Sequence, residues 1–105
     1  MISNFKKVLV LAPHTDDGEL GAGGTISKLI ENNAEVFYAA FSTAEESVPK
    51  HLPKDILRSE VSDATLKLGI KSENLIVLNY KVRNLNYQIK NILEDLIKMR
   101  NDINP

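Results

Sequence analysis

The sequence predicts an α/β fold in which a parallel sheet lies between two layers of helices, in the order β-α-β-α-β-α. Three short apolar runs alternate with segments whose apolar residues recur at helical spacing, and this alternation is typical of βαβ units. Each run is apolar at nearly every position, as expected for parallel strands buried on both faces. The first run is followed by a polar loop, glycines and a helical pattern, which is the layout of a site at the carboxyl end of a strand.

The sequence also indicates where the elements end. Asn32 and Asn33 are expected to end the first helix and Gly69 the second. Strands are expected at residues 5–11, 35–42 and 74–80, and helices at 25–33 (with a start nearer Gly21), 55–68 and 87–99. No fourth strand follows the third helix. We therefore expect residues 1–105 to form part of a single, truncated domain, with one sheet edge uncovered.

The composition is that of a small globular protein, with 43% hydrophobic and 26% charged residues among 105. The formal net charge of −1 and the interleaved signs argue against nucleic acid or an anionic membrane as a partner. Cysteine is absent, which excludes disulfides and thiolate metal sites. No apolar stretch approaches the roughly 18 residues of a membrane span. We therefore expect a soluble, cytoplasmic protein.

The loop after the first strand concentrates the residues that carry chemistry. His14, Asp16 and Asp17 lie within four positions, and imidazole and carboxylate groups are common ligands of zinc and other divalent ions. His14 and Asp17 can share one ion if the loop is tight, and Asp16 can then accept a proton from water. A catalytic zinc site usually has three protein ligands, so the residues alone also permit a polar turn that caps the following helix.

The glycines after this loop raise the alternative of a phosphate cradle. The G-x-G-x-x-G pattern fails, because Ile26 stands where a third glycine would follow Gly21 and Gly23, and no Gly-Lys-Ser/Thr sequence is present. Aspartates in the turn would also repel phosphate. A tight turn that lets helix and strand approach closely is the simpler interpretation of the glycines at positions 18, 21, 23 and 24.

The stretch APHTDDGELGAGGTISKL resembles the opening of the PIG-L/LmbE-like N-acetylglucosaminyl deacetylases, whose signature is Pro/Ala-His-Pro-Asp-Asp followed by glycines. The segment from Arg58 to Gly69 resembles that family's Arg/Glu helix, which ends in Leu-Gly. The resemblance implies a Rossmann-like fold, Zn²⁺ or another divalent metal as cofactor, and a small amino-sugar substrate. It implies His14 and Asp17 as metal ligands, and Asp16 as general base in a hydrolysis that removes an N-acyl (acetyl) group with metal-bound water as nucleophile.

The chain departs from the family pattern in its loop and in its ligand set. Thr15 replaces the usual proline, and Gly18 replaces a common glutamate. Family members supply a third ligand histidine from a later segment, which has no counterpart here. His51 is the only other histidine, and it lies in a polar loop between prolines, where we interpret it as solvated, with a residue at the edge of the substrate as the alternative. We therefore expect an incomplete metal site in this chain alone.

Two hypotheses from different classes follow. The first is the N-terminal part of a metal-dependent sugar N-deacetylase. The second is a non-catalytic subunit or remnant that pairs its sheet edge with another chain, either as a homo-oligomer or with a complementing chain. Arg58 is a candidate substrate-binding residue, with a surface helix charge as the alternative. Glu45 and Glu46 are interpreted as solvated loop charges, with sugar contact as the alternative.

Overall fold

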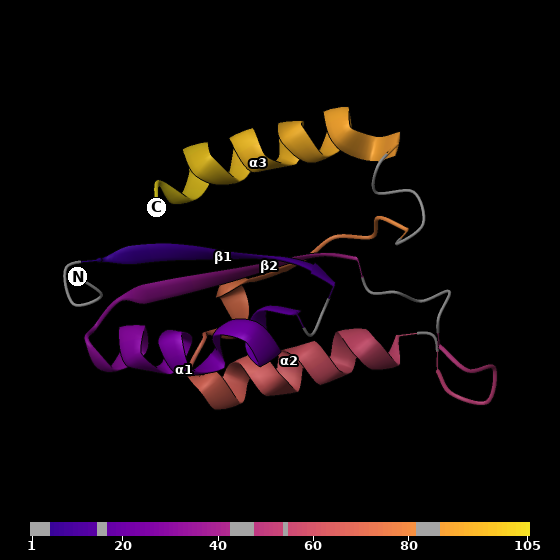
Figure 1. The fold of residues 1–105 in the computed structure, drawn as a ribbon, viewed down its shortest axis with the longest axis horizontal. Coiled ribbons are helices and arrows are strands. Elements are labelled where there is room, and N and C mark those ends of the chain that lie inside the picture. Colours follow the sequence, from indigo (N-terminus) through magenta and orange to yellow (C-terminus); the bar gives the residue numbers. More distant parts are fainter. Residues whose placement is uncertain (1–4, 15–16, 43–47, 54, 82–86) are drawn as a thin grey trace.

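The computed structural model describes residues 5–14, 17–42, 48–53, 55–81 and 87–105, and for residues 14 and 17–22 it describes the backbone only. These residues form three strands and three α-helices in the predicted alternating order (Figure 1). The elements are β1 (Lys7–His14), α1 (Asp17–Glu31), β2 (Glu35–Ser42), α2 (Ile56–Leu68), a short 3-10 turn (Ser72–Asn74), β3 (Leu75–Val77) and α3 (Ile89–Ile103). The fold is therefore the predicted α/β fold with a parallel sheet.

The sheet has the order β1-β2-β3, and both pairs of strands are parallel. Lys7 aligns with Glu35 at one end of the β1–β2 pair, and His14 aligns with Ser42 at the other. β3 is short and pairs with the middle of β2, where Tyr38 aligns with Leu75. The carboxyl ends of all three strands consequently lie at one edge of the sheet, which we call the carboxyl edge.

Helices cover both faces of the sheet, as the apolar strands predict. Figure 1 shows α1 and α2 on one face and α3 alone on the other. The first face holds the larger core, in which Ile26 of α1 and Val61 of α2 are buried among side chains such as Val36 and Tyr38 of β2. On the second face, Met99 and Ile103 of α3 are buried against alternate residues of the strands, among them Leu9, Phe37 and Ala39.

The glycine segment differs from its prediction. Positions 18, 21, 23 and 24 lie inside α1, which begins at Asp17 rather than near Gly21. Each glycine costs a helix roughly 0.5–1 kcal/mol relative to alanine, so burial of the apolar face of α1 must offset a substantial penalty. That burial is visible at Ile26 and Leu29, which are 0% and 4% exposed. Tertiary packing therefore overrides the local preference of the sequence.

The ends of β1 and α3 also differ from prediction. β1 was expected to end at Leu11, but it continues through Pro13 to His14. In β1 only every second residue directs its backbone N–H and C=O groups to β2, and Pro13 is not one of these residues. The N–H that proline lacks would therefore not have bonded β2, so Pro13 is tolerated in this strand. α3 was expected to end at Met99, but it runs to Ile103, whose side chain is buried, and Asn104 ends it in the left-handed conformation.

Candidate functional site at the carboxyl edge

The chemistry-bearing loop joins the carboxyl end of β1 to the first residue of α1. His14 is the last residue of β1 and lies beside Ser42, the last residue of β2. Asp17 is the first residue of α1, so the positive end of the helix dipole lies at this edge. The backbone therefore places His14 and Asp17 at the carboxyl edge of the sheet, where open α/β sheets bind ligands.

Parts of the predicted site lie outside the described residues. Asp16 is one of them, as are Thr15, Glu45 and Glu46, and the side chains of His14 and Asp17 also lie outside. Among the side chains that the structure describes, no group of three or more histidines or carboxylates is close enough to hold a metal ion. The ligand roles of His14 and Asp17 and the base role of Asp16 therefore stay predictions.

Arg58 reaches the carboxyl edge from the first turn of α2. Its Nη2 donates a hydrogen bond of 2.6 Å to Oδ1 of Asn79. Asn79 lies two residues beyond the end of β3. The third strand was predicted to end at Tyr80, but it ends at Val77. A guanidinium group is thus present at the same edge as His14, which is the location that a substrate-binding role requires.

A shallow hollow adjoins Asn79 on the α3 side of the sheet. It has a volume of about 320 Å³ and is lined by Leu78, Asn79, Tyr80 and Asp95. The Tyr80 hydroxyl donates a 2.5 Å hydrogen bond to Oδ2 of Asp95. That hydrogen bond, together with partial burial and the carboxylate charge, raises the pKa of Tyr80 to about 12. Tyr80 also contacts Phe41, with ring centroids 6.4 Å apart.

Sequence reasoning missed Asn79 and Asp95 as residues near the site. Asn79 was placed inside the third strand, although a polar residue after the run Leu75–Val77 could have indicated the end of that strand. Asp95 lies on α3, far from the loop in sequence, and no local pattern links it to Tyr80. His51 is exposed in the loop before α2, as predicted.

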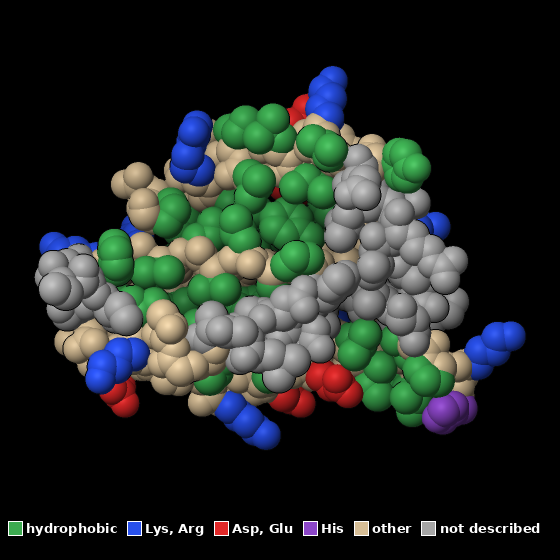
Figure 2. Space-filling view, viewed as in Figure 1, with side chains coloured by type: hydrophobic (Ala, Val, Ile, Leu, Met, Phe, Trp, Pro, Cys, Tyr) green, Lys and Arg blue, Asp and Glu red, His purple; other side chains and the backbone are tan. Residues whose placement is uncertain are grey.

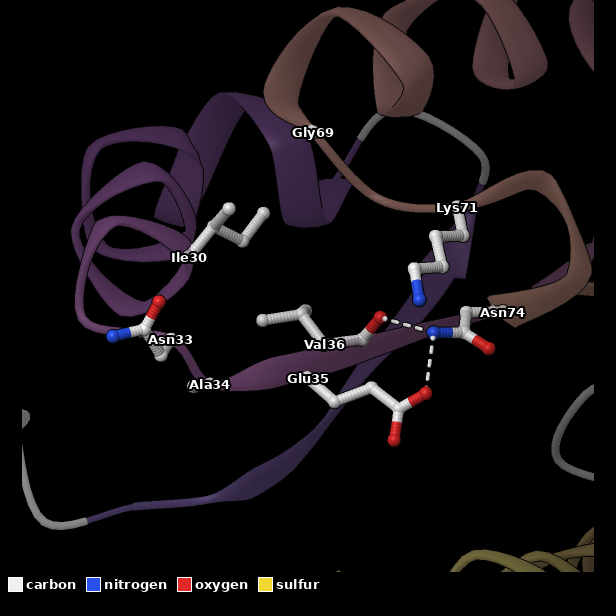
Figure 3. Close-up of a pocket in the computed structure, with 8 residues that line it drawn as sticks. All are labelled: Ile30, Asn33, Ala34, Glu35, Val36, Gly69, Lys71 and Asn74. Atoms are coloured by element: carbon white, nitrogen blue, oxygen red, sulfur yellow. Dashed lines mark hydrogen bonds between the residues drawn. The ribbon is translucent and has the colours of Figure 1, made fainter.

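A second cavity, of about 370 Å³, lies at the opposite edge of the sheet, near the start of β2 (Figure 3). The Asn74 side chain is 5% exposed there, and its Nδ2 donates to Glu35 Oε2 at 3.3 Å and to the Val36 carbonyl at 3.4 Å. These bonds tie the 3-10 turn to β2. His14 and Asp17 mark the other end of β1, so this cavity is not part of the candidate site.

Comparison with known proteins identifies the relatives of this chain. Residues 9–105 match the PIG-L family, described as GlcNAc-PI de-N-acetylase. The chain belongs to the PIG-L family. Within it, the chain is 36% identical over 75 residues to a diacetylchitobiose deacetylase of Thermococcus kodakarensis, a match that covers 66% of this chain and 28% of that protein.

Solved structures of similar proteins share the fold. The N,N'-diacetylchitobiose deacetylase of Pyrococcus horikoshii, complexed with the inhibitor MPG, superposes with a TM-score of 0.65 at 35% identity, over 76% of this chain and 31% of that one. The conserved protein TT1542 of Thermus thermophilus superposes with a TM-score of 0.58 at 30% identity, over 70% of this chain and 31% of that one. This PIG-L chain thus spans less than a third of the length of each of these relatives.

Proposed function

We propose that this chain carries the metal-binding and base-bearing part of a PIG-L N-deacetylase, which hydrolyses the acetamide of an N-acetylated amino sugar or its conjugate. One observation carries the proposal. The sequence His14-Thr15-Asp16-Asp17 joins the carboxyl end of β1 to the start of α1, within the region that matches the family. Two relatives are named diacetylchitobiose deacetylases, and this supports an N-acetylglucosamine-type substrate.

The donor set fits a divalent metal. Imidazole and carboxylate are ligand types that zinc accepts, and the loop offers both at the end of a buried strand. His14 and Asp17 would hold the ion. When bound, the ion lowers the pKa of a coordinated water and polarises the amide carbonyl. Asp16 would accept the proton of the attacking water and return it to the leaving amine.

Arg58 is assigned to substrate binding in this proposal. Its bond to the Asn79 amide uses one of the five guanidinium N–H groups, so others can donate to sugar hydroxyl oxygens or to an acyl oxygen. The hollow beside Asn79 is of a size that a sugar ring could partly fill. Arg58 would therefore affect the affinity for the substrate and leave the affinity for the metal unchanged.

The competing candidate is a non-catalytic chain whose acidic loop only caps α1. It is favoured by the position of Asp17 as the first residue of α1, where a carboxylate interacts favourably with the helix dipole. Measuring metal binding distinguishes the proposed deacetylase site from a loop that only caps α1. A cap needs no ion, whereas the proposed site binds one ion through His14 and Asp17, weakly if only two protein ligands are present.

The test is calorimetric titration of the chain with Zn²⁺, with four variants beside it. His14→Ala and Asp17→Ala should each lower the zinc affinity at least about tenfold, because each removes one of two ligands. Asp16→Asn should leave zinc affinity within about threefold, since a base outside the coordination shell does not hold the ion. His51→Ala is the matched control, as it removes the exposed histidine of the loop before α2. Equal zinc affinity in the wild type and in His14→Ala would refute the proposed site.

A further inference from the structure

The cavity at the start of β2 lies at the end of the sheet opposite the carboxyl edge, and we call it the amino-edge cavity (Figure 3). Its volume of about 370 Å³ is within the range of sites that hold small molecules. β2 runs from Glu35 at this cavity to Ser42 beside His14, so the length of a strand separates the cavity from the candidate metal site. The ligand of the amino-edge cavity is therefore a separate question from the proposed function.

One wall of the amino-edge cavity is apolar. It includes Ile30 of α1 and Val36 of β2, and Ile30 is only half-buried although it packs against the core. Gly69, which follows α2, contributes backbone to this wall, because a Cβ added there would lie 3.3 Å from both Cδ1 and Cγ2 of Ile30. This wall favours contact with an aliphatic group of a ligand.

Opposite charges line the other side of the cavity. The half-buried Glu35 accepts a hydrogen bond at its Oε2 from Nδ2 of Asn74 at 3.3 Å. Asn74 is 5% exposed and also donates to the Val36 carbonyl at 3.4 Å, so a buried amide holds the Glu35 carboxylate at the cavity. Lys71 lines the same side (Figure 3). Among the described residues, its ammonium forms no ion pair with Glu35 or with another carboxylate.

Two opposite charges that share a small cavity without pairing indicate a ligand that carries both charges. The Asn74 amide occupies Oε2 of Glu35, and no described residue donates to Oε1. Oε1 can therefore accept from a cationic donor of a ligand, while the Lys71 ammonium can donate to an anionic acceptor. Hydrogen bonds between charged groups are shorter and stronger than those between neutral groups.

The helix ends favour the cationic part of such a ligand. α1 and α2 both end at the cavity, where Asn33 and Gly69 line it. The negative ends of two helix dipoles therefore border the cavity, and they disfavour a ligand that is only anionic, such as phosphate. A divalent metal ion is disfavoured as well, because Glu35 is the single carboxylate among the lining residues and Lys71 would repel the ion.

The charge of the whole surface fits a ligand without net charge. Figure 2 shows basic and acidic side chains interspersed around the rim of one face rather than gathered by sign. The formal net charge of the chain is −1. The protein thus lacks a large net charge that would attract anions or cations from solution, and recognition depends on the two charges within the cavity.

We propose that the amino-edge cavity binds a small α-amino acid with an aliphatic side chain, in its zwitterionic form. The ligand carboxylate accepts from the Lys71 ammonium, and the ligand ammonium donates to Oε1 of Glu35. The aliphatic side chain of the ligand lies against Ile30 and Val36. Asn74 orients Glu35 and is not itself a ligand contact.

The test is titration of the isotope-labelled 105-residue chain with L-valine, followed by NMR of the backbone amides. We expect saturable shifts at Asn33, Gly69 and Asn74, with a dissociation constant of roughly 1 mM, as expected for a ligand of so few atoms. Two analogues of L-valine each lack one charge: isobutylamine lacks the carboxylate, and isovalerate lacks the ammonium. Each analogue should bind at least about tenfold more weakly, because one charge-assisted hydrogen bond is lost.

Variants of the two charged residues test which group of the ligand each one binds. In Lys71→Met, L-valine should bind no more tightly than isobutylamine, because the ligand carboxylate has lost its partner. In Glu35→Gln, which keeps an oxygen that can accept from Asn74, L-valine should bind no more tightly than isovalerate. Lys67→Met is the matched control, since Lys67 is an exposed lysine in the last turn of α2 that does not line the cavity. Its affinity for L-valine should stay within about threefold of the wild type.

Three results would overturn the inference. One is the absence of saturable shifts with L-valine up to about 20 mM. Another is binding of both analogues as tightly as L-valine, because a site for a zwitterion uses both charges. The third is tighter binding of inorganic phosphate or N-acetylglucosamine at the same amides, which would assign the cavity to an anion or a sugar. None of these results concerns zinc binding by His14, so the proposed function stands or fails by its own test.

Discussion

Truncation of Ile26 to alanine tests how α1, which begins where the acidic loop ends at Asp17, is held on the sheet. Ile26 is 0% exposed in the core between α1, α2 and the sheet. The substitution removes three buried carbon atoms, worth about 0.8 kcal/mol each in transfer free energy, and leaves a cavity that close neighbours fill only in part. We expect the free energy of unfolding to fall by about 3–4 kcal/mol, a large fraction of the roughly 5–15 kcal/mol typical of a domain.

The assay is urea unfolding followed by circular dichroism at 222 nm, with Ile89→Ala as the matched control. Ile89 is 66% exposed on α3, and its truncation should change the free energy of unfolding by less than about 0.5 kcal/mol. The dependence of that free energy on urea should be the same in all three proteins. A loss below about 1 kcal/mol for Ile26→Ala, or equal losses in the two variants, would refute the packing of α1 described above.

Four further predictions concern single contacts and backbone positions. In a double-mutant cycle, Arg58→Ala and Asn79→Ala should show a coupling of about 0.5–1 kcal/mol in unfolding free energy, because their 2.6 Å bond is exposed to water; additive effects would contradict it. Gly24→Ala should raise the free energy of unfolding by up to about 1 kcal/mol, since a methyl group there meets nothing within 4 Å. Gly69→Ala should lower the free energy of unfolding by about 1 kcal/mol or more, because the φ of +96° at the end of α2 is strained for alanine. A change of the same sign in both glycine variants would refute this. The hydrogen bond to Asp95 raises the pKa of Tyr80 to about 12, so the stability that the protonated Tyr80 contributes is present below pH 10 and is lost between pH 10 and 12. The Tyr80→Phe variant should therefore lose less unfolding free energy than the wild type between pH 10 and 12. Identical pH profiles of the two proteins would contradict the shift.

The sequence predicted the layers of the fold because the signals for its strands are strong. β2 was placed at residues 35–42 without error, since its apolar run is bounded by the left-handed Asn33 turn and by a polar loop. The end of α2 at Gly69 was also correct, because the left-handed backbone there favours glycine. Local patterns of this kind act over a few residues and survive in the folded chain.

Errors arose where long-range packing decides the local structure. The start of α1 was misplaced because its glycines are poor helix formers, and only burial of Ile26 and Leu29 explains the helix. Pro13 suggested the end of β1, yet a proline on the unpaired side of an edge strand costs no ladder bond. The proximity of Arg58 to Asn79 depends on how α2 lies against the end of β3, which no local pattern encodes.

The site was predicted from three residues and a resemblance, and the structure describes the backbone of two of them, His14 and Asp17. Both lie at the carboxyl edge, at the end of β1 and the start of α1. The family match over residues 9–105 confirms the resemblance. The roles of His14, Asp16 and Asp17 concern side chains outside the described residues, and they are decided by experiment.

The most direct test of the proposed metal site is a nitrogen NMR spectrum of the two histidine rings with and without Zn²⁺. The chain has only two histidines, His14 and His51, so each ring signal can be assigned by a single variant. We expect zinc to shift the ring nitrogens of His14 and to leave those of His51 unchanged, because His14 directly precedes the sequence Thr15-Asp16-Asp17 and is the proposed ligand. No shift at His14, or a shift at His51 alone, would contradict a metal site at the end of β1.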